Sequence, residues 1–297
     1  MKTNNTAYLA LATTSLIWGS TWVVMKWGIQ GMPPLQLAAI RQLLGGLILV
    51  GFFLYKGEAF PSQKQLFQIF ILSIFTFVLA NGLSTWSLQY LPSGLAALIG
   101  ALYPLSVVVM EYFIFKNKQI NTATVVGVLL GIAGIATVLS EHVFISHTPG
   151  FAWGILLASI AMLSWSYSTI MIGRSKVNIN PYFGMGWQML FSSGMIAILA
   201  LIKGNNLAFS EIPTNSWIAI AYLIVMGSLL AMMAFIYTMK HLPAPIASLY
   251  AYINPIVAIM IGTVVLDEHI TWQLIVGTVI TLLGVYLVNK SFKKATA

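Results

Sequence analysis

The sequence predicts an all-α integral membrane protein, and three observations lead to that fold class. Of the 297 residues, 59% are hydrophobic and only 7% are charged, and the mean hydropathy is +0.90. An ordinary soluble domain carries roughly a quarter charged residues, so this surface could not be wetted by water. The connectors between apolar runs are no longer than about ten residues, which leaves no room for a separate soluble domain.

Ten apolar segments of about 20 residues follow one another, each long enough to cross roughly 30 Å of hydrocarbon as a helix. Runs such as residues 107–110 do not alternate apolar and polar side chains, which disfavours a membrane barrel. Helices satisfy the backbone hydrogen bonds within each segment, as lipid requires. The segments lie near residues 7–27, 34–55, 66–88, 93–115, 121–140, 150–173, 182–202, 216–239, 244–266 and 270–290.

The basic residues predict the orientation. With a cytoplasmic N-terminus, inner connectors carry eleven of the fourteen Lys and Arg residues, outer connectors carry Lys26 and Lys203, and Arg41 lies inside a span. The positive-inside rule therefore places both termini in the cytoplasm. The net charge of +8 becomes a topology signal that faces anionic lipid, and we expect no nucleic-acid partner. The eleven inner residues are Lys2, Lys56, Lys64, Lys116, Lys118, Arg174, Lys176, Lys240, Lys290, Lys293 and Lys294.

The second half of the chain repeats the pattern of the first. Trp18 aligns with Trp165 at an offset of 147 residues, and Pro104 aligns with Pro255 at an offset of 151. Co-aligned Trp, Pro and Gly residues in the same order predict two duplicated five-helix units, residues 7–140 and 150–290. Because five is odd, the second unit must enter the membrane in the opposite sense, which is the inverted-repeat plan of secondary transporters.

Two prolines lie deep inside predicted spans at matching repeat positions, Pro104 and Pro255. A mid-helix proline removes a backbone hydrogen bond and kinks the helix. In a membrane such a kink persists where a neighbour or a cavity satisfies the freed carbonyl. The symmetric pair predicts hinges beside a cavity, and simple packing kinks are the alternative.

Aromatic, amide and hydroxyl side chains from several spans fall near mid-depth. Trp and Tyr normally prefer the membrane interfaces, so their place at the centre is unusual. Such a lining suits an uncharged or zwitterionic amphiphile, whereas the alternative is that these residues only pack helices together. The substrate-binding candidates of this kind are Trp18, Thr21, Trp22, Asn81, Thr85, Trp86, Tyr103, Trp165, Tyr250 and Asn254.

Two charged residues lie within spans. Arg41 is expected about 10 Å below the outer surface and Glu111 about 6 Å above the inner one, so they are too far apart in depth to pair. An intramembrane charge is a functional hypothesis by default. Arg41 is a candidate for binding a substrate carboxylate and Glu111 for carrying a proton, with snorkelling to the nearby surface as the alternative for both.

Small residues predict close helix packing. Gly127 and Gly131 on the fifth span are echoed by Gly277 and Thr281 on the tenth. Such small-xxx-small pairs let two helix backbones approach closely. Packing of these two spans within one chain is the favoured interpretation, so we expect a monomer, and dimerisation is the alternative.

Several short motifs resemble the EamA-like family of the drug/metabolite transporter superfamily over the whole chain, in two units. They are the residues WGSTW at 18–22, the Pro pair at 33–34 followed by Arg41, Asn81-Gly82 through Trp86, LPSG at 91–94 and Tyr103-Pro104-Leu105. The resemblance implies a ten-helix carrier of the bacterial inner membrane, generally an exporter of amino acids or other small metabolites, with a cavity lined by both halves. One departure is that the acidic turn of such units is present at 267–268 but replaced by Lys-Asn-Lys at 116–118.

A carrier is therefore the predicted function, with an intramembrane enzyme or a channel as the alternative. An enzyme needs deep acid, base or nucleophilic groups, yet the sole aspartate, Asp267, lies at a span end and neither G-x-S-x-G nor H-E-x-x-H occurs. A channel lacks a ring of charges or a carbonyl filter sequence. The four histidines show no metal-ligand spacing. We expect no cofactor and no metal, and a small-molecule substrate and the lipid bilayer as partners.

Overall fold

The structure is a computed structural model that describes residues 2–114, 122–144, 149–174, 179–242 and 249–295. Every regular element in these ranges is a helix. Eight helices are long and apolar enough to cross a membrane, and two shorter apolar helices cover Tyr250–Val265 and Trp272–Val288. Lys116, Lys118 and Lys176 of the predicted inner connectors, and the start of the ninth predicted segment, lie outside the described residues.

The helices follow the predicted segments closely. The first half contains α1 (Lys2–Gly28), α2 (Pro34–Tyr55), α3 (Gln63–Ser73), η1 (Ile74–Gly82), α4 (Leu83–Ser87), α5 (Ser93–Gly100), α6 (Tyr103–Phe113) and α7 (Thr122–Phe144). The second half contains α8 (Phe151–Arg174), α9 (Pro181–Lys203), η2 (Phe209–Glu211), α10 (Thr214–Tyr222), η3 (Leu223–Leu230), α11 (Ala231–His241), α13 (Tyr250–Val265) and α14 (Trp272–Ala295).

Helices α2 and α9 begin and end with the same chemistry. Pro34 and Pro181 occupy the first helical position, where the missing N–H is not needed. Gly57 and Gly204 follow the two helices with φ of +85° and +72°, a left-handed conformation that glycine adopts without steric cost. These residues fix the ends of both helices from the local sequence.

The third and eighth segments are not continuous α-helices. A π-helix, η1, lies between α3 and α4, and a second π-helix, η3, lies between α10 and α11. A π-helix bonds residue i to i+5 and leaves local backbone groups available to other partners, and such segments are frequent at functional sites. The apolar pattern of these segments did not predict the change of helix type.

The fourth segment is interrupted before Pro104. Helix α5 ends at Gly100, the chain turns at 101–102, and Pro104 lies in the first turn of α6. Residues 101 and 102 keep right-handed helical angles, so Pro104 lies beside a local interruption inside one span, Ser93–Phe113. Pro255, its predicted counterpart, does lie inside a helix, α13.

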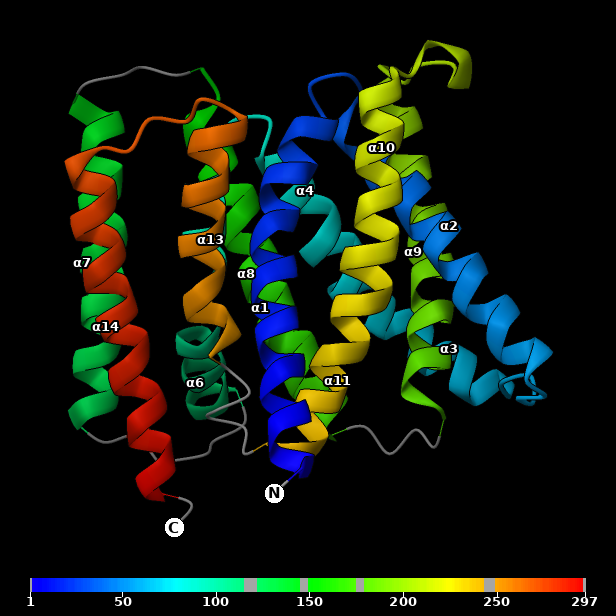
Figure 1. Ribbon diagram of the computed structural model, residues 1–297, viewed down its shortest axis with the longest axis horizontal. Helices are drawn as coiled ribbons and strands as arrows, with labels where there is room; N and C mark the ends of the chain where they lie inside the picture. Colours follow the sequence, from blue (N-terminus) through cyan, green and yellow to red (C-terminus); the bar gives the residue numbers. More distant parts are fainter. Residues whose placement is uncertain (1, 115–121, 145–148, 175–178, 243–248, 296–297) are drawn as a thin grey trace.

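Helices from the two halves of the chain lie beside each other in the bundle. Helices α7 and α14 pack together at one edge, α2 packs against α9, and α1 at the centre packs against α13 and α11 (Figure 1). Helix α1 begins and α14 ends at the lower end of this view, which also holds the connector at 56–62 (Figure 1). The chain therefore makes an even number of passes between the two ends.

Glycines hold α7 and α14 together. A carbon added to Gly127 would lie 2.6 Å from the Gly284 carbonyl oxygen, and one added to Gly134 would lie 2.6 Å from the Gly277 carbonyl oxygen. These distances are shorter than any real contact, so only glycine fits. The predicted packing of these spans within one chain is confirmed for these residues.

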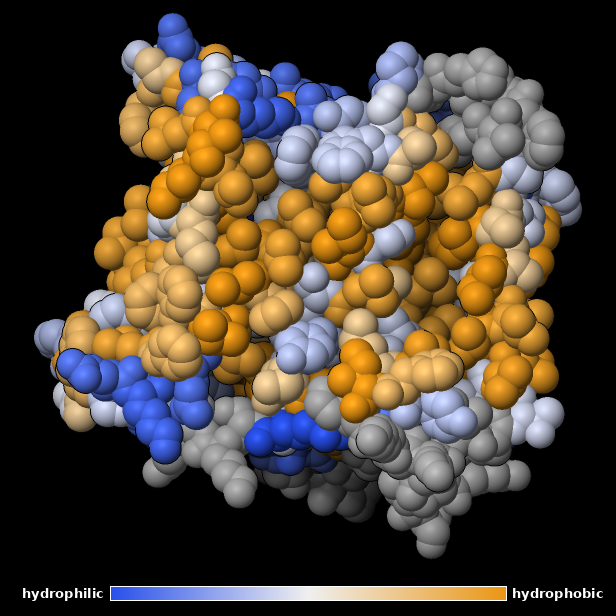
Figure 2. Space-filling model, turned by 180° about the vertical axis from the view of Figure 1, so that it is seen from behind, coloured by the Kyte–Doolittle hydropathy of each residue, from blue (hydrophilic) through white to orange (hydrophobic). Residues whose placement is uncertain are grey.

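The surface carries a wide apolar belt. Figure 2 shows orange, hydrophobic side chains across the middle of the molecule and blue, hydrophilic ones toward its upper and lower ends. Large apolar side chains such as Leu47, Ile202 and Val264 are more than half exposed at the surface. A belt of this kind matches the hydrocarbon of a bilayer, where apolar side chains need no cover.

Candidate functional site

A cavity of about 170 Å³ lies between helices of the two halves. Its lining comes from α1, α2, η1, α4, α5 and α6 of the first half and from α8, α9, η3, α11 and α13 of the second. No described residue of α7 or α14 lines it. Nine of the eleven predicted binding residues do, namely Trp18, Thr21, Trp22, Arg41, Asn81, Tyr103, Trp165, Tyr250 and Asn254.

Aromatic rings form one wall of the cavity. The Trp18 ring on α1 meets the Trp165 ring on α8 edge to face, with centroids 6.2 Å apart. Trp18 also contacts Tyr250 at 5.2 Å and Phe235 at 5.0 Å, and Tyr103 stacks beside Tyr250 at 6.1 Å. We call these five residues the aromatic box; all of them except Phe235 line the cavity. Such edge-to-face and offset pairs fix the rings in place and leave ring surface for an apolar ligand group.

The π-helix η3 anchors the aromatic box. Trp18 donates its indole N–H to the backbone carbonyl of Gly227, with Nε1 3.2 Å from the oxygen. Gly227 lies within η3, and π-helical segments are frequent at functional sites. This hydrogen bond ties the central Trp of the site to η3.

Arg41 occupies the cavity wall beside η3. Its side chain is only 6% exposed, although it carries a full charge. Arg41 Nε lies 3.1 Å from the Ser228 hydroxyl, and Nη1 lies 3.6 Å from the Met25 sulfur. Gly227 leaves room for the guanidinium, because a carbon added there would lie 3.3 Å from Arg41 Nη2. In the described chain no carboxylate lies within ion-pair distance of this arginine.

Asn81 is held in the cavity by its neighbours. Gln42 donates its amide nitrogen to Asn81 Oδ1 at 2.8 Å, and Thr85 donates its hydroxyl to the Asn81 backbone carbonyl at 2.8 Å. Thr85 is fully buried and also lies 3.4 Å from the Met25 sulfur. Thr85 therefore supports the lining of the cavity from behind and does not itself line it.

Asn254 links α13 to α1 at the cavity edge. With its amide nitrogen oriented toward α1, it donates to the Ser15 and Tyr250 carbonyls at 3.0 Å each. Gly19 permits this close approach, because a carbon added there would lie 2.6 Å from the Val257 side chain. Asn254 thus combines a packing contact with a place in the lining.

Two predicted functional residues lie elsewhere. Trp86 lines a separate apolar pocket of about 220 Å³, with the Lys203 ammonium 4.4 Å from its ring centre. Glu111 forms an ion pair with Arg174, at 2.7 Å between its Oε2 and Nη2, and does not line the cavity. The structure does not bring either residue to the central cavity.

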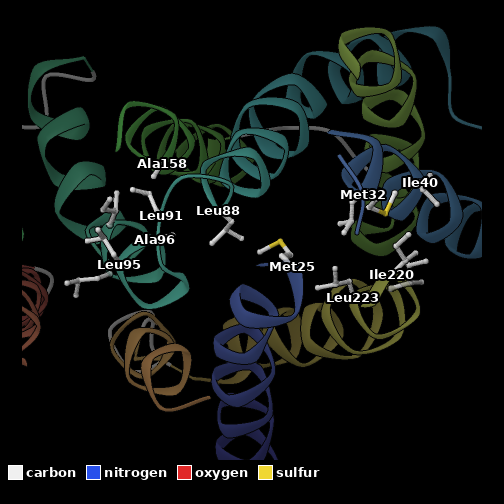
Figure 3. Packing of buried hydrophobic residues seen from close by; sticks show 14 of the residues in the cluster. Met25, Met32, Ile40, Leu88, Leu91, Leu95, Ala96, Ala158, Ile220 and Leu223 are labelled. Carbon is white, nitrogen blue, oxygen red and sulfur yellow. The ribbon is translucent and has the colours of Figure 1, made fainter. Parts of the chain in front are cut away.

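A cluster of packed apolar side chains extends from the cavity lining at Met25 toward the connectors at one end of the bundle. Figure 3 shows Met25 between two groups of buried residues, one from α5, α8 and the connector at 88–92 and one mainly from α2, α10 and η3. Leu88 stands on one side of Met25 and Leu223 on the other, and each is about 1% exposed or less. The cluster reaches the connectors at Met32 and Leu91. We call it the apolar plug.

An ion-pair network lies above the apolar plug. Glu268 accepts hydrogen bonds from the Ser93 backbone N–H and hydroxyl, both at 2.7 Å, and lies 3.4 Å from the Lys26 ammonium. Lys26 also donates to the Leu91 carbonyl at 2.6 Å. The network ties the end of α1 to the start of α5 and to the turn before α14. We call these residues, Lys26, Leu91, Ser93 and Glu268, the outer latch, because the orientation predicted from the sequence would place them on the outer side.

The sequence did not identify several residues of the site. Ser228, which contacts Arg41, and Phe235 of the aromatic box had no distinguishing pattern, because serine and phenylalanine are common in membrane helices. Methionine is equally easy to mistake for ordinary core, although its flexible thioether suits an adaptable binding surface. Five methionines line the cavity: Met25, Met162, Met185, Met189 and Met232.

Comparison with known proteins supplies the family. The profile of the EamA-like transporter family matches residues 5–140 and 152–290. The chain is 30% identical to the uncharacterized inner membrane transporter YedA of Escherichia coli, covering 94% of this chain and 91% of that protein. It is 27% identical to a WAT1-related chloroplastic protein of Arabidopsis thaliana, covering 95% of this chain and 69% of that protein.

Two further similarities extend over nearly the whole chain. The uncharacterized transporter YvbV of Bacillus subtilis is 27% identical, with 97% of this chain and 93% of that protein covered. A solved crystal structure superimposes with a TM-score of 0.67 over 99% of each chain at 18% sequence identity. At that identity the superposition shows the shared fold alone.

Proposed function

The chain belongs to the EamA-like transporter family, and from this membership we propose that it is a secondary transporter that exports small metabolites such as amino acids or related amphiphiles across a bacterial inner membrane. The observation that carries the proposal is the central cavity, which both halves of the chain line with aromatic, polar and methionine side chains. An apolar cavity of about 150 Å³ accepts benzene, so about 170 Å³ suits a small amphiphile.

We propose that the chain consists of two inverted five-helix repeats, residues 7–140 and 150–290. The paired ends of α2 and α9 and the π-helices in the third and eighth segments support the duplication. The location of α1's start and α14's end at one face of the bundle is consistent with an even total of ten spans (Figure 1). In inverted-repeat transporters the substrate site lies at mid-depth where the units meet.

Alternating access is the proposed mechanism. We propose that the apolar plug and the outer latch separate the cavity from the upper end of the bundle, which the positive-inside count favours as the outer side. We propose that Pro104 and Pro255 act as hinges through which the wall formed by α6 and α13 moves, and that the plug separates when the latch breaks. The aromatic box and Arg41 then form a fixed site that is reached from one side at a time.

Transport and orientation are tested together. Purified protein in proteoliposomes should exchange a radiolabelled internal solute for an external one, saturably and without ATP. Because the chain has no cysteine, single cysteines can be introduced at Ser146 and Ser291. An impermeant thiol reagent should label the first in whole cells and the second only in inverted membrane vesicles. The reverse labelling would overturn the proposed orientation, and turnover of the solute into a product would indicate an enzyme.

A further inference from the structure

The charge of the central cavity is unbalanced. Arg41 is the only charged residue among those that line it. The chain has six acidic residues, and the side chains of five are described: Glu58, Glu111, Glu211, Asp267 and Glu268. None of these five lines the cavity, so the described lining holds one positive charge and no negative one.

Two other partly buried basic residues of this chain each have an acidic partner. Lys26 pairs with Glu268, and Arg174 pairs with Glu111. Arg41 is more deeply buried than either, yet its contacts in the described chain are the Ser228 hydroxyl and the Met25 sulfur. Burying a charge without a counter-ion costs free energy. An anion that enters the cavity offsets this cost, because it pairs with Arg41 and accepts a hydrogen bond away from water.

The guanidinium has spare donors for such an anion. Arginine carries five N–H groups in a planar fork that matches the two oxygens of a carboxylate. The two contacts of Arg41 use two of them, and both go to neutral atoms. Three N–H groups are left for a ligand, which is enough for a bidentate carboxylate pair.

The aromatic box lies next to this charge. Trp18 bonds to the carbonyl of Gly227, and Arg41 bonds to the hydroxyl of the next residue, Ser228. Consecutive residues of η3 therefore hold the apolar wall and the cationic group. A ligand that satisfies both needs an anionic group separated by only a short chain from an apolar or aromatic group.

We infer that the substrate of the proposed transporter is an amphiphilic monocarboxylate, with its carboxylate on Arg41 and its apolar group in the aromatic box. This inference rests on the proposed function and narrows its substrate class. An amino acid brings an ammonium group as well, for which the described lining offers no acidic partner. A cationic amphiphile would place a second positive charge beside Arg41, so we expect it to bind more weakly than the monocarboxylate.

A charge series on one aromatic skeleton tests the inference. The probes are 3-phenylpropanoate, phenylalanine, 3-phenylpropanamide and 3-phenylpropylamine, titrated by calorimetry into the purified protein. We expect the carboxylate to bind about ten- to hundredfold more tightly than the neutral amide, because a hydrogen bond to a charged group contributes that much. Phenylalanine should bind more weakly than the carboxylate, and the amine weakest of all.

A variant pair assigns the effect to Arg41. Arg41→Gln should lower the affinity for 3-phenylpropanoate about ten- to hundredfold and leave that for the amide unchanged within about twofold. Arg174→Gln, which removes a basic residue outside the cavity, should change neither. If Arg41→Gln does not fold, the wild-type series alone decides. Equal loss for all four probes in Arg41→Gln would overturn the inference, because it would indicate a purely structural role.

Exchange assays separate this inference from the proposed function. Proteoliposomes that exchange the amine or phenylalanine but not 3-phenylpropanoate would leave the transporter proposal intact and overturn the monocarboxylate inference. Tight binding of 3-phenylpropanoate at Arg41 without any exchange would support the site and contradict transport of this class. Binding of none of the four probes would contradict the inference outright.

Discussion

The α7–α14 pair and the helices around the cavity differ in how closely their backbones approach each other. In the pair, Gly127 and Gly134 lie directly against the backbone of α14, so the helices touch with nothing between them. Around the cavity, large side chains such as Trp18, Trp165 and Arg41 keep the helices apart and leave about 170 Å³ unfilled. One region is a scaffold made by small residues, and the other is a site made by bulky ones.

This difference separates stability from function in the chain. Substitutions in the α7–α14 pair act on the backbone contact of two helices, and α5, α6 and α13 lie between that contact and the cavity. Substitutions in the lining remove groups that already border empty space, so the helices can stay where they are. We therefore expect unfolding to report on the first region and ligand binding on the second.

The largest expected effect is a loss of thermal stability when the contact between α7 and α14 is disrupted. Gly134→Leu places a side chain where the Gly277 carbonyl oxygen and the Thr281 amide nitrogen lie 2.6 Å from the first added carbon. Overpacking of this kind costs about 1–3 kcal/mol or more, so the melting temperature in detergent should fall by several degrees. Gly194→Leu is the control, because nothing lies within 4 Å of a carbon added there. Equal melting temperatures for the two variants would show that the pair is not a scaffold.

The next effect should appear in binding alone. Trp165→Ala removes the ring that meets Trp18 edge to face at 6.2 Å, and an aromatic contact of this kind contributes about 1 kcal/mol. The dissociation constant of an aromatic probe should rise severalfold, while the melting temperature changes little. Trp153→Ala on the same helix serves as the control, since Trp153 is 44% exposed and lies outside the lining. Unchanged affinity in Trp165→Ala would move the site away from the aromatic box.

A smaller effect is expected where the two regions meet, at the hinge. Pro255→Ala restores a backbone donor inside α13 and should stabilise that helix. If bending at Pro255 accompanies the exchange of open states, transport should slow severalfold while the affinity for substrate stays the same. Stopped-flow exchange in proteoliposomes measures the rate. Unaltered transport would leave Pro255 as a packing kink only.

The smallest effect is expected at Glu111. Its partner Arg174 has a side chain that is 47% exposed, and a surface ion pair contributes at most about 1 kcal/mol. Glu111→Gln should therefore leave stability and exchange almost unchanged at any pH. Loss of transport driven by a pH gradient, with solute exchange retained, would instead establish Glu111 as the proton site.

Much of the fold could be predicted because its determinants are local. Long apolar runs predict the spans, and Pro34 and Gly57 predict the ends of α2 at the residues observed. The π-helices could not be predicted in this way, because α- and π-helices in lipid demand the same apolar side chains. The break before Pro104 was missed for a related reason, since an apolar turn at 101–102 looks like more helix.

The site residues that could be predicted from the sequence are those whose type is unusual at the centre of a membrane. Trp18, Tyr103 and Trp165 were recognisable because large amphipathic rings at mid-depth are rare, and the structure brings them together. Ser228 could not be identified, because its role depends only on facing Arg41 across the bundle. Trp86 fits the family motif, yet α4 turns it toward Lys203 of α9, and only the three-dimensional arrangement reveals this.

The π-helix η1 lets the cavity tolerate a change in the number of residues. A π turn holds one residue more than an α turn, so deleting one residue within 74–82 would return the segment to α-helical spacing and leave Ser84 on α4 in the cavity wall. The same deletion inside a regular α-helix would rotate every residue beyond it by about 100°. Single-codon insertions and deletions in η1 and η3 are thus a route by which the lining changes within the π segment itself while both flanking helices keep their faces.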